Sequence, residues 1–373
     1  MTTDVPRGPL QGESASELRA RVAAHTAVGT RLALCGDRRL AEMVAAAPGR
    51  GSGIGGRSAE TEVEGRPVFV KRVPLTDVEL RPEHLRSTAN LFGLPLPYQY
   101  GAGSAGFGAW RELATHVMTT GWVLEDAYGG FPLLHHWRVL PDRPPAGFAD
   151  EFGGVDGAVA HWDGSPAVRD RLEAIGRSTS SLVLFLEHVP RTLAGWLDER
   201  RDAARPDAAS PRWVEEELLR GTEFMSARGL VHFDAHFANL LTDGRRVYFA
   251  DFGLASSREF ELSAREADFL TDHLGYDRSY VMGRLLRHHL PDALRGDEGH
   301  RDFLRAWLAG RRPDGVPADV GALLDRHAAH SLVLDDFHHR LLTRSKRTPF
   351  PAAELRASLA GGRAPGGAPA ARP

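Results

Sequence analysis

The sequence predicts an α+β fold with two lobes, a small N-terminal lobe built on an antiparallel sheet and a larger helical C-terminal lobe. Short strand patterns dominate the first half of the chain, whereas helical periodicity dominates the second half. A thin connector near residues 187–190 separates the two halves. The 373 residues are 42% hydrophobic and 25% charged, which is typical of a soluble globular protein that buries a core in each lobe.

The N-terminal half supplies the strands of the small lobe. A helical pattern covers residues 13–28, and residues 39–47 are ambiguous between helix and strand. A helix is expected over 109–119. Strands are expected over 59–63, 68–73, 131–140 and 181–188. Glu64-Gly65-Arg66 is a plausible hairpin turn between the first two strands.

The C-terminal half is mainly helical. Helices are expected over 192–200, 213–228, 264–274, 280–289, 301–309 and 322–342. Two short strands, 240–242 and 247–250, flank the turn Asp243-Gly244.

Composition also divides the chain into parts. Residues 1–14 are polar and expected to be loose, 74–108 are rich in Pro and Gly, and 141–166 are interpreted as an inserted loop. The expected organisation is an N-terminal extension with the first small-lobe element (1–48), a small lobe with these insertions (49–189), a helical lobe (190–359) and a disordered tail (360–373).

Charge and cysteine usage exclude several functional classes. A formal net charge of −3 gives no overall attraction to nucleic acid or to an anionic membrane. No apolar run approaches the length of a membrane span, and the N-terminus lacks the apolar core of a secretory signal. Cys35 is the only cysteine, so neither a disulfide framework nor a cysteine metal cluster is expected. These features predict a cytoplasmic protein.

The strongest chemical signal lies in residues 231–253. An expected helix ends at Arg228-Gly229, and the chain then carries Asp234 and Asn239 on a loop and Asp251 after a short hairpin. Phosphoryl transfer needs a carboxylate that accepts the proton of the attacking hydroxyl and oxygen ligands that hold Mg²⁺ against the phosphates. The pattern H-x-D-x-x-x-x-N followed by D-F-G supplies these groups in order.

These residues resemble the catalytic and metal-binding loops of the protein-kinase-like superfamily, which includes protein kinases and the aminoglycoside and choline kinase-like enzymes. The resemblance implies a protein-kinase-like bilobal fold that uses ATP and Mg²⁺. It implies that Asp234 is the catalytic base, Asn239 and Asp251 are Mg²⁺ ligands, and His232 supports the loop. The alternative is a surface loop whose carboxylates have no catalytic role.

A glycine-rich stretch upstream agrees with this resemblance. Gly51, Gly53 and Gly56 satisfy G-x-G-x-x-G, in which glycines let backbone N–H groups approach phosphates. The motif alone is weak in a glycine-rich chain. A dinucleotide-binding site needs a helix directly after the motif, whereas a β-hairpin is expected here, as in kinases.

Lys71 closes that hairpin, where kinases place the lysine that binds the α- and β-phosphates. Lys71 and Lys346 are the only lysines among the 46 basic residues, and all the others are arginines. A lysine that is kept in such a composition indicates that the position needs an ammonium group. Glu112 is the best candidate for the partner of Lys71. Glu83, Glu125 and a role for Glu112 on the surface remain open.

The connector resembles a kinase hinge. Adenine is expected to bind backbone groups around Glu187 and Val189, with Leu186 at the back of the pocket. Taken by itself, this apolar run is an ordinary buried strand.

The pattern also departs from that of ordinary protein kinases. Phe233 replaces the arginine of H-R-D, which argues against a switch by loop phosphorylation, and no A-P-E follows. His236 is similar to the histidine of small-molecule kinases and is expected either to contact the γ-phosphate or to pack the loop. The D-F-G is more typical of protein kinases. Residues 340–347, RLLTRSKR, are expected to form a solvated helix end rather than a site for an anion.

The expected function is therefore transfer of the γ-phosphate of ATP to a hydroxyl group of a small molecule, such as an antibiotic, an amino alcohol or a sugar. The first alternative is a Ser/Thr kinase that acts on a protein or on a biosynthetic precursor peptide. The second is a non-catalytic ATP-binding scaffold, which the complete set of ionic groups disfavours. The sequence does not predict the acceptor, the oligomeric state or the regulation.

Overall fold

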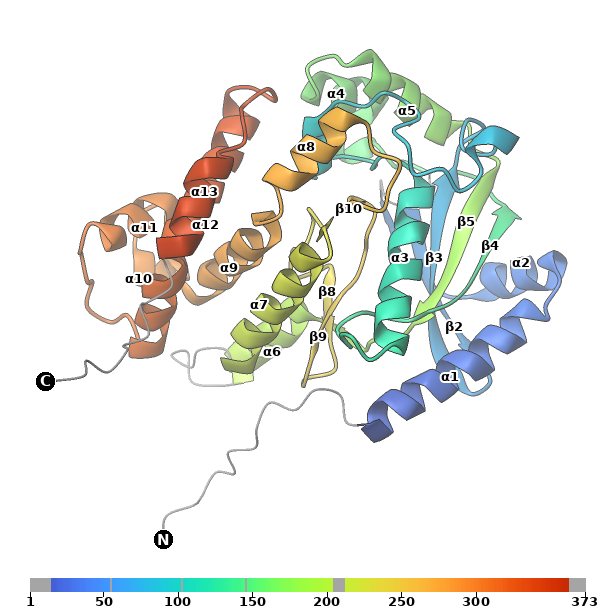
Figure 1. Ribbon diagram of the computed structural model, residues 1–373, viewed down its shortest axis with the longest axis horizontal. Coiled ribbons are helices and arrows are strands. Elements are labelled where there is room, and N and C mark those ends of the chain that lie inside the picture. Colours follow the sequence, from blue (N-terminus) through green and yellow to red (C-terminus); the bar gives the residue numbers. More distant parts are fainter. Residues whose placement is uncertain (1–14, 54–55, 102, 145, 204–211, 362–373) are drawn as a thin grey trace, which may run out of the picture.

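The computed structural model describes residues 15–53, 56–101, 103–144, 146–203 and 212–361. The fold is α+β, with a five-stranded antiparallel sheet at one end of the molecule and a group of helices at the other (Figure 1). None of the helices in the described ranges combines the length and the apolar character that crossing a membrane requires.

The five-stranded sheet has the order β1-β2-β3-β5-β4, and each neighbouring pair is antiparallel. Its strands are β1 (Gly49–Gly53), β2 (Gly56–Val63), β3 (Arg66–Leu75), β4 (Leu134–Pro141) and β5 (Ser180–Glu187). Val63 pairs with Arg66, so Glu64 and Gly65 alone form the turn, with φ of 52° and 69°. Positive φ at both turn positions matches the twist of the strands, and the predicted hairpin is confirmed.

Helices cover both faces of this sheet. On one face, α1 (Ala15–Ala33) and α2 (Asp37–Ala46) pack against Val70 and Phe185. On the other face, α3 (Ala109–Leu124) packs against Leu75 and Leu184. Because both faces are covered, β5 is apolar at nearly every position, as its sequence predicted. The ambiguous residues 39–47 are mostly helical.

The two insertions pack against each other. Residues 74 and 75 end β3, and the described residues of 76–108 are irregular apart from the short helices η1 (Pro82–His84) and η2 (Leu96–Tyr100). The interpretation of 141–166 as a loop is wrong, because η3 (Asp150–Phe152) and α4 (Gly154–His161) lie within it and α5 (Pro166–Gly176) follows. Val159 and Trp162 of this insertion share a core with Leu94 and Tyr98 of the first insertion. The sequence analysis missed this helix because the glycines of α4 interrupt the spacing of its apolar residues.

The helical part begins after the connector. Its helices are α6 (Leu193–Ala203), α7 (Arg212–Ala227), α8 (Ala264–Asp272), α9 (Tyr276–His289), α10 (Asp292–Arg295), α11 (His300–Leu308), α12 (Ala318–Thr343) and α13 (Ala352–Gly361). Its strands are β6 (Arg191–Thr192), β7 (Leu230–Val231), β8 (Leu240–Thr242), β9 (Val247–Phe249) and β10 (Ser256–Ser257). The largest apolar core lies here, where α7, α9 and α12 meet around Met225, Leu285 and Leu324.

The chain ends differ in part from expectation. The disordered tail was expected from residue 360, but Ala360 and Gly361 are the last residues of α13. The rest of that tail and residues 1–14 lie outside the described residues.

Candidate active site

A cavity of about 440 Å³ lies between the sheet and the helical part, bordered by the β1–β2 hairpin, β3, the connector and the loops around β8 and β9. The sequence-predicted residues that line it are Gly51, Gly56, Lys71, Glu187, Val189, Asn239 and Asp251. Gly53 does not line the cavity and pairs with Gly56 across the hairpin, whose tip, residues 54 and 55, lies outside the described residues. The volume suits a small ligand.

Lys71 lies between two carboxylates at the back of this cavity. Its Nζ is 2.6 Å from Oε1 of Glu112 and 2.7 Å from Oδ1 of Asp251. Residues 74–108 loop out between β3 and α3, so the long sequence separation does not keep Glu112 away, and it is the partner among the three glutamates considered. Burial alone would lower the pKa of Lys71, but Asp251 and Glu112 raise it, so the ammonium group stays charged.

Asp234 follows β7 on a loop with unusual backbone geometry. Phe233 and Asp251 have φ of 64° and 62°, a region that costs a non-glycine residue energy and is common at functional sites. Nδ2 of Asn239 donates hydrogen bonds of 3.0 Å to both Oδ2 and the carbonyl oxygen of Asp234. Nε2 of His236 lies 3.8 Å from Oδ2 of Asp234. Burial, with the charge of Asp251 adding to it, raises the pKa of Asp234 to about 7, which suits a general base.

His232 is fully buried beneath the loop. Its Nε2 lies 2.8 Å from the carbonyl oxygen of Ala250, and its Nδ1 accepts a hydrogen bond of 3.3 Å from the backbone N–H of Asp234. Burial lowers the pKa of His232 to about 4, so the neutral ring joins the Asp234 loop to the chain that enters Asp251.

Asn239 and Asp251 are the candidate metal ligands, and both line the cavity. Burial alone would raise the pKa of Asp251, but Lys71 lowers it to about 2, so this carboxylate is ionised. In the described ranges, no three His, Cys, Asp or Glu side chains are grouped to hold a metal by themselves. One carboxylate and one amide oxygen fit Mg²⁺, which takes one or two protein ligands together with phosphate oxygens.

The connector is fixed by a residue that the sequence analysis did not identify. Arg21 of α1 donates to Oε1 and Oε2 of Glu187 at 2.9 and 2.7 Å, and also to the carbonyl oxygens of Gly129 and Phe131. Both carboxylate oxygens of Glu187 are therefore occupied by Arg21. Val189 also lines the cavity, and its backbone N–H and C=O make no hydrogen bond with a described residue.

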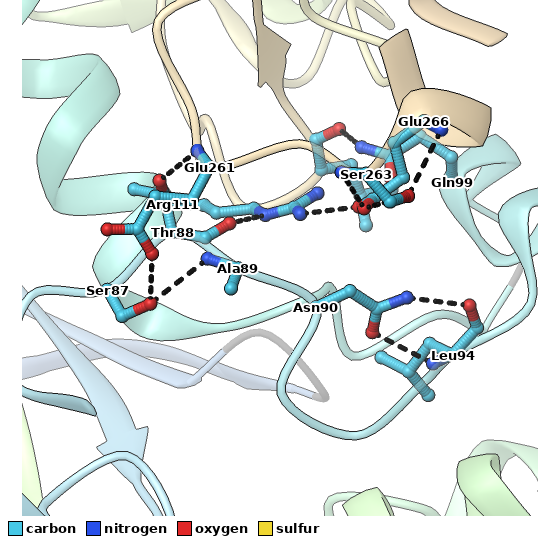
Figure 2. Close-up of polar contacts among 11 residues, drawn as sticks. Ser87, Thr88, Ala89, Asn90, Leu94, Gln99, Arg111, Glu261, Ser263 and Glu266 are labelled. Carbon is cyan, nitrogen blue, oxygen red and sulfur yellow. Dashed lines mark hydrogen bonds and ion pairs between the residues drawn. The ribbon is translucent and has the colours of Figure 1, made fainter. Parts of the chain in front are cut away.

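The segment after Asp251-Phe252-Gly253 is tied to the first insertion (Figure 2). Gln99 donates to the carbonyl oxygen of Leu254, and the backbone N–H of Glu261 donates to Oγ1 of Thr88 at 2.8 Å. Arg111 of α3, only 2% exposed, donates to the carbonyl oxygen of Thr88 and to Oε1 of Glu266, each at 2.7 Å. Helix α3 thus holds Glu112 against Lys71 and binds both of these segments through the preceding residue, Arg111.

Asp277 on α9 anchors the Asp234 loop. Its carboxylate accepts hydrogen bonds from the backbone N–H groups of His232 and Phe233 at 2.7 and 3.0 Å. Burial raises the pKa of Asp277 to about 7, although both hydrogen bonds favour its ionised form. The sequence analysis missed this residue, because it lies before the expected helix 280–289, whereas α9 begins at Tyr276 and buries it.

Replacing Asp277 with Ala is expected to lower the free energy of unfolding by about 3 kcal/mol, because two buried N–H groups lose their acceptor at roughly 1–3 kcal/mol each. Urea denaturation measures this change. The matched control is Asp272→Ala, which removes an exposed ion pair with Arg356 and should cost less than about 1 kcal/mol. Equal stability of the two variants would contradict the anchoring role.

The predicted site residues are therefore largely together. Glu112, Asn239 and Asp251 line a smaller cavity of about 160 Å³ together with Asp234 and His236, and Lys71 contacts Glu112 and Asp251. Besides Arg21 and Asp277, sequence reasoning missed the buried His116, which lines the larger cavity. Comparison with known proteins gives no match to this chain, among either protein-family models or curated sequences.

Proposed function

We propose that the protein is a phosphotransferase with a protein-kinase-like bilobal fold that transfers the γ-phosphate of ATP to a hydroxyl group of a small molecule. The observation that supports this proposal best is the cluster of charged side chains formed by Lys71, Glu112 and Asp251, with Asp234 and Asn239 beside it. ATP as donor is consistent with a cytoplasmic enzyme.

Each side chain has a role in this proposal. Lys71 binds the α- and β-phosphates, and Glu112 holds its ammonium group in place. Asn239 and Asp251 would hold Mg²⁺, which supplies positive charge to the phosphates. Asp234 orients the acceptor hydroxyl and takes its proton while the oxygen bonds to the γ-phosphorus and ADP leaves. Backbone groups of Val189 bind the adenine ring.

The first alternative, a peptide kinase, is favoured only by the D-F-G sequence. The segment that follows it is short and tied to residues 87–99, which leaves little free backbone for a peptide substrate. The second alternative, a scaffold without activity, is disfavoured because the sequence carries every ionic group that phosphoryl transfer needs.

Label transfer from γ-labelled Mg·ATP tests the proposed function. Wild-type protein and the Asp234→Asn variant are incubated with an extract of the source cells that is separated into small-molecule and macromolecular fractions. Label that depends on Asp234 and appears in the small-molecule fraction is expected. Label confined to macromolecules would replace the proposal with the peptide alternative.

Replacing Asp251 with Ala is expected to weaken Mg·ATP binding by at least about tenfold, or about 1.4 kcal/mol, because the only carboxylate ligand is lost. Isothermal titration calorimetry measures the affinity. Lys71 keeps Glu112 as a partner, so the fold should be retained. Asp243→Ala, in the turn between β8 and β9, is the control and should bind as wild type does. Unchanged affinity in Asp251→Ala would exclude the metal assignment.

A further inference from the structure

A further cavity, of about 550 Å³, is lined by Asp234 and His236. Its walls come from α9, from α12 with the residues that follow it, and from Trp162 at the end of α4. This volume is within the range of small-molecule sites. If Asp234 is the catalytic base, this is the space in which an acceptor hydroxyl can reach it.

The charged side chains that line this cavity are mostly cationic. They are Asp234, Arg284, Arg287, Arg301, Asp335 and Lys346. Arg287 is paired with Asp335 at 2.7 Å, and Arg301 is paired with Asp336 at 3.1 Å. Among the described residues, no carboxylate lies within 4.0 Å of the cationic groups of Arg284 or Lys346. Two positive charges in the cavity therefore lack an ion-pair partner.

Lys346 is withdrawn from solvent, with 9% of its surface exposed. Its Nζ lies 3.1 Å from Nε2 of His161 and 5.1 Å from the ring centroid of Trp162. The expectation of a solvated helix end is thus wrong for this residue, because the second insertion folds over it. Burial lowers the pKa of Lys346, and the charge of Asp163 only partly opposes this effect. A buried ammonium group is costly unless an anion compensates it.

Arg284 lies closer to the reacting groups. Its Nη2 donates a hydrogen bond of 2.8 Å to the hydroxyl of Tyr280, one turn earlier on α9. Burial raises the pKa of Asp234, but the charge of Arg284 acts in the opposite direction, which places the guanidinium within electrostatic reach of the base. The cavity therefore joins a base at one side to two cations that have no ion-pair partner among the described residues.

We propose that this cavity binds the acceptor and that the acceptor is a small anionic alcohol, whose carboxylate or phosphate group binds Arg284 and Lys346 while its hydroxyl lies at Asp234. This inference rests on the proposed phosphotransferase function. In the reaction, the acceptor oxygen forms a bond to the γ-phosphorus, the bond from that phosphorus to ADP breaks, and the hydroxyl proton passes to Asp234. A cationic amino alcohol or aminoglycoside would add positive charge to a site that already has two cations without an ion-pair partner.

The first test identifies the charge class of the acceptor. Small molecules from the source cells are separated by ion exchange into anionic, neutral and cationic fractions before incubation with γ-labelled Mg·ATP. Label that depends on Asp234 should arise in the anionic fraction. Lys346→Gln and Arg284→Gln should each lower its rate at least about tenfold at limiting acceptor, whereas the exposed Arg356→Gln should not. Label from the cationic or neutral fraction, or wild-type rates in both variants, would overturn the proposal.

The second test needs no turnover. Lys346 lines this cavity and its lowered pKa favours the neutral amine, so acylation by acetic anhydride, read by mass spectrometry, reports on it. The anionic fraction, with nucleotides removed, should slow acylation of Lys346, and phosphatase treatment of that fraction should abolish protection only if the anion is a phosphate ester. Unprotected Lys346 would exclude the anion site. Failure of Mg·ATP to bind the same protein in calorimetry would instead contradict the proposed function.

Discussion

Replacing Asp234 with Asn is expected to slow phosphoryl transfer by about 10³-fold, within the usual contribution of about 10²–10⁴ from a general base. An amide cannot take the proton of the acceptor hydroxyl, but its oxygen can still accept the hydrogen bond from Nδ2 of Asn239. Loop geometry and Mg·ATP affinity should therefore be kept. Steady-state rates and calorimetric ATP binding measure the two effects, with Asp243→Asn as the control.

A variant that retained more than about a tenth of the wild-type rate would contradict the assignment of Asp234 as the base. Loss of ATP binding together with activity would show that Asp234 supports the nucleotide site instead.

The same carboxylate gives this prediction a pH signature. Burial raises the pKa of Asp234 to about 7, and only the ionised form accepts a proton, so kcat/KM should rise with pH up to about 7 and then level off. The folded state binds this proton more tightly than the unfolded state, so protonation of Asp234 stabilises the fold at low pH. This contribution to the free energy of unfolding is lost as the pH rises from about 4 to about 7. Asp234→Asn should therefore be more stable than wild type at pH 8, and thermal denaturation measures the difference. The lower stability of the wild type is then a cost of its proposed function.

Replacing Glu79 with Ala is expected to lower the free energy of unfolding by about 3–5 kcal/mol. Glu79 is 1% exposed, and its Oε2 accepts hydrogen bonds from Nη1 of Arg171 at 2.7 Å and from both polar groups of Thr76. Its Oε1 accepts a hydrogen bond of 2.8 Å from the backbone N–H of Ala109, at the start of α3. The substitution leaves Arg171, 2% exposed, as a buried charge without its carboxylate. Urea denaturation measures the loss.

The control for this prediction is Glu173→Ala, which removes only exposed ion pairs with Arg169 and Arg177 and should cost less than about 1 kcal/mol. The double variant with Glu79→Met and Arg171→Met should recover much of the stability, because the unpaired charge is removed together with its partner. A loss in Glu79→Ala no larger than that in Glu173→Ala would contradict the role of this buried pair.

Features with a local cause were the ones that the sequence could predict. The β2–β3 hairpin follows from alternating residues around a two-residue turn, and β5 follows from an apolar run. The Asp234 loop and Asp251 were recognisable because their spacing is short and chemically specific. Pairing across the fold was predictable only for Lys71 and Glu112, where the resemblance to kinases supplied the partner.

Other contacts depend on the tertiary arrangement and leave no pattern in the sequence. Arg21 reaches Glu187 across 166 positions, and Arg171 reaches Glu79 across 92 positions. Many arginines and glutamates in the chain could form such pairs, so composition does not select them. Helix α4 was missed because glycines interrupt its apolar spacing, and Lys346 was taken as exposed because the cover over it comes from that same helix.

The hydrogen bonds and the ion pair shown in Figure 2 also constrain the order in which the chain folds during synthesis. They join Ser87, Gln99 and Arg111 to partners 155 to 174 positions later, and Lys71 meets Asp251 across 180 positions. All strands of the large sheet have been made when residue 187 has been added, but the polar groups on α3 and in the first insertion still lack their partners. At about 5–20 residues per second, this condition lasts for roughly ten seconds until residue 266 is made. The strands of the sheet are therefore present before these polar side chains gain their partners, and the proposed catalytic centre is among the last parts to assemble.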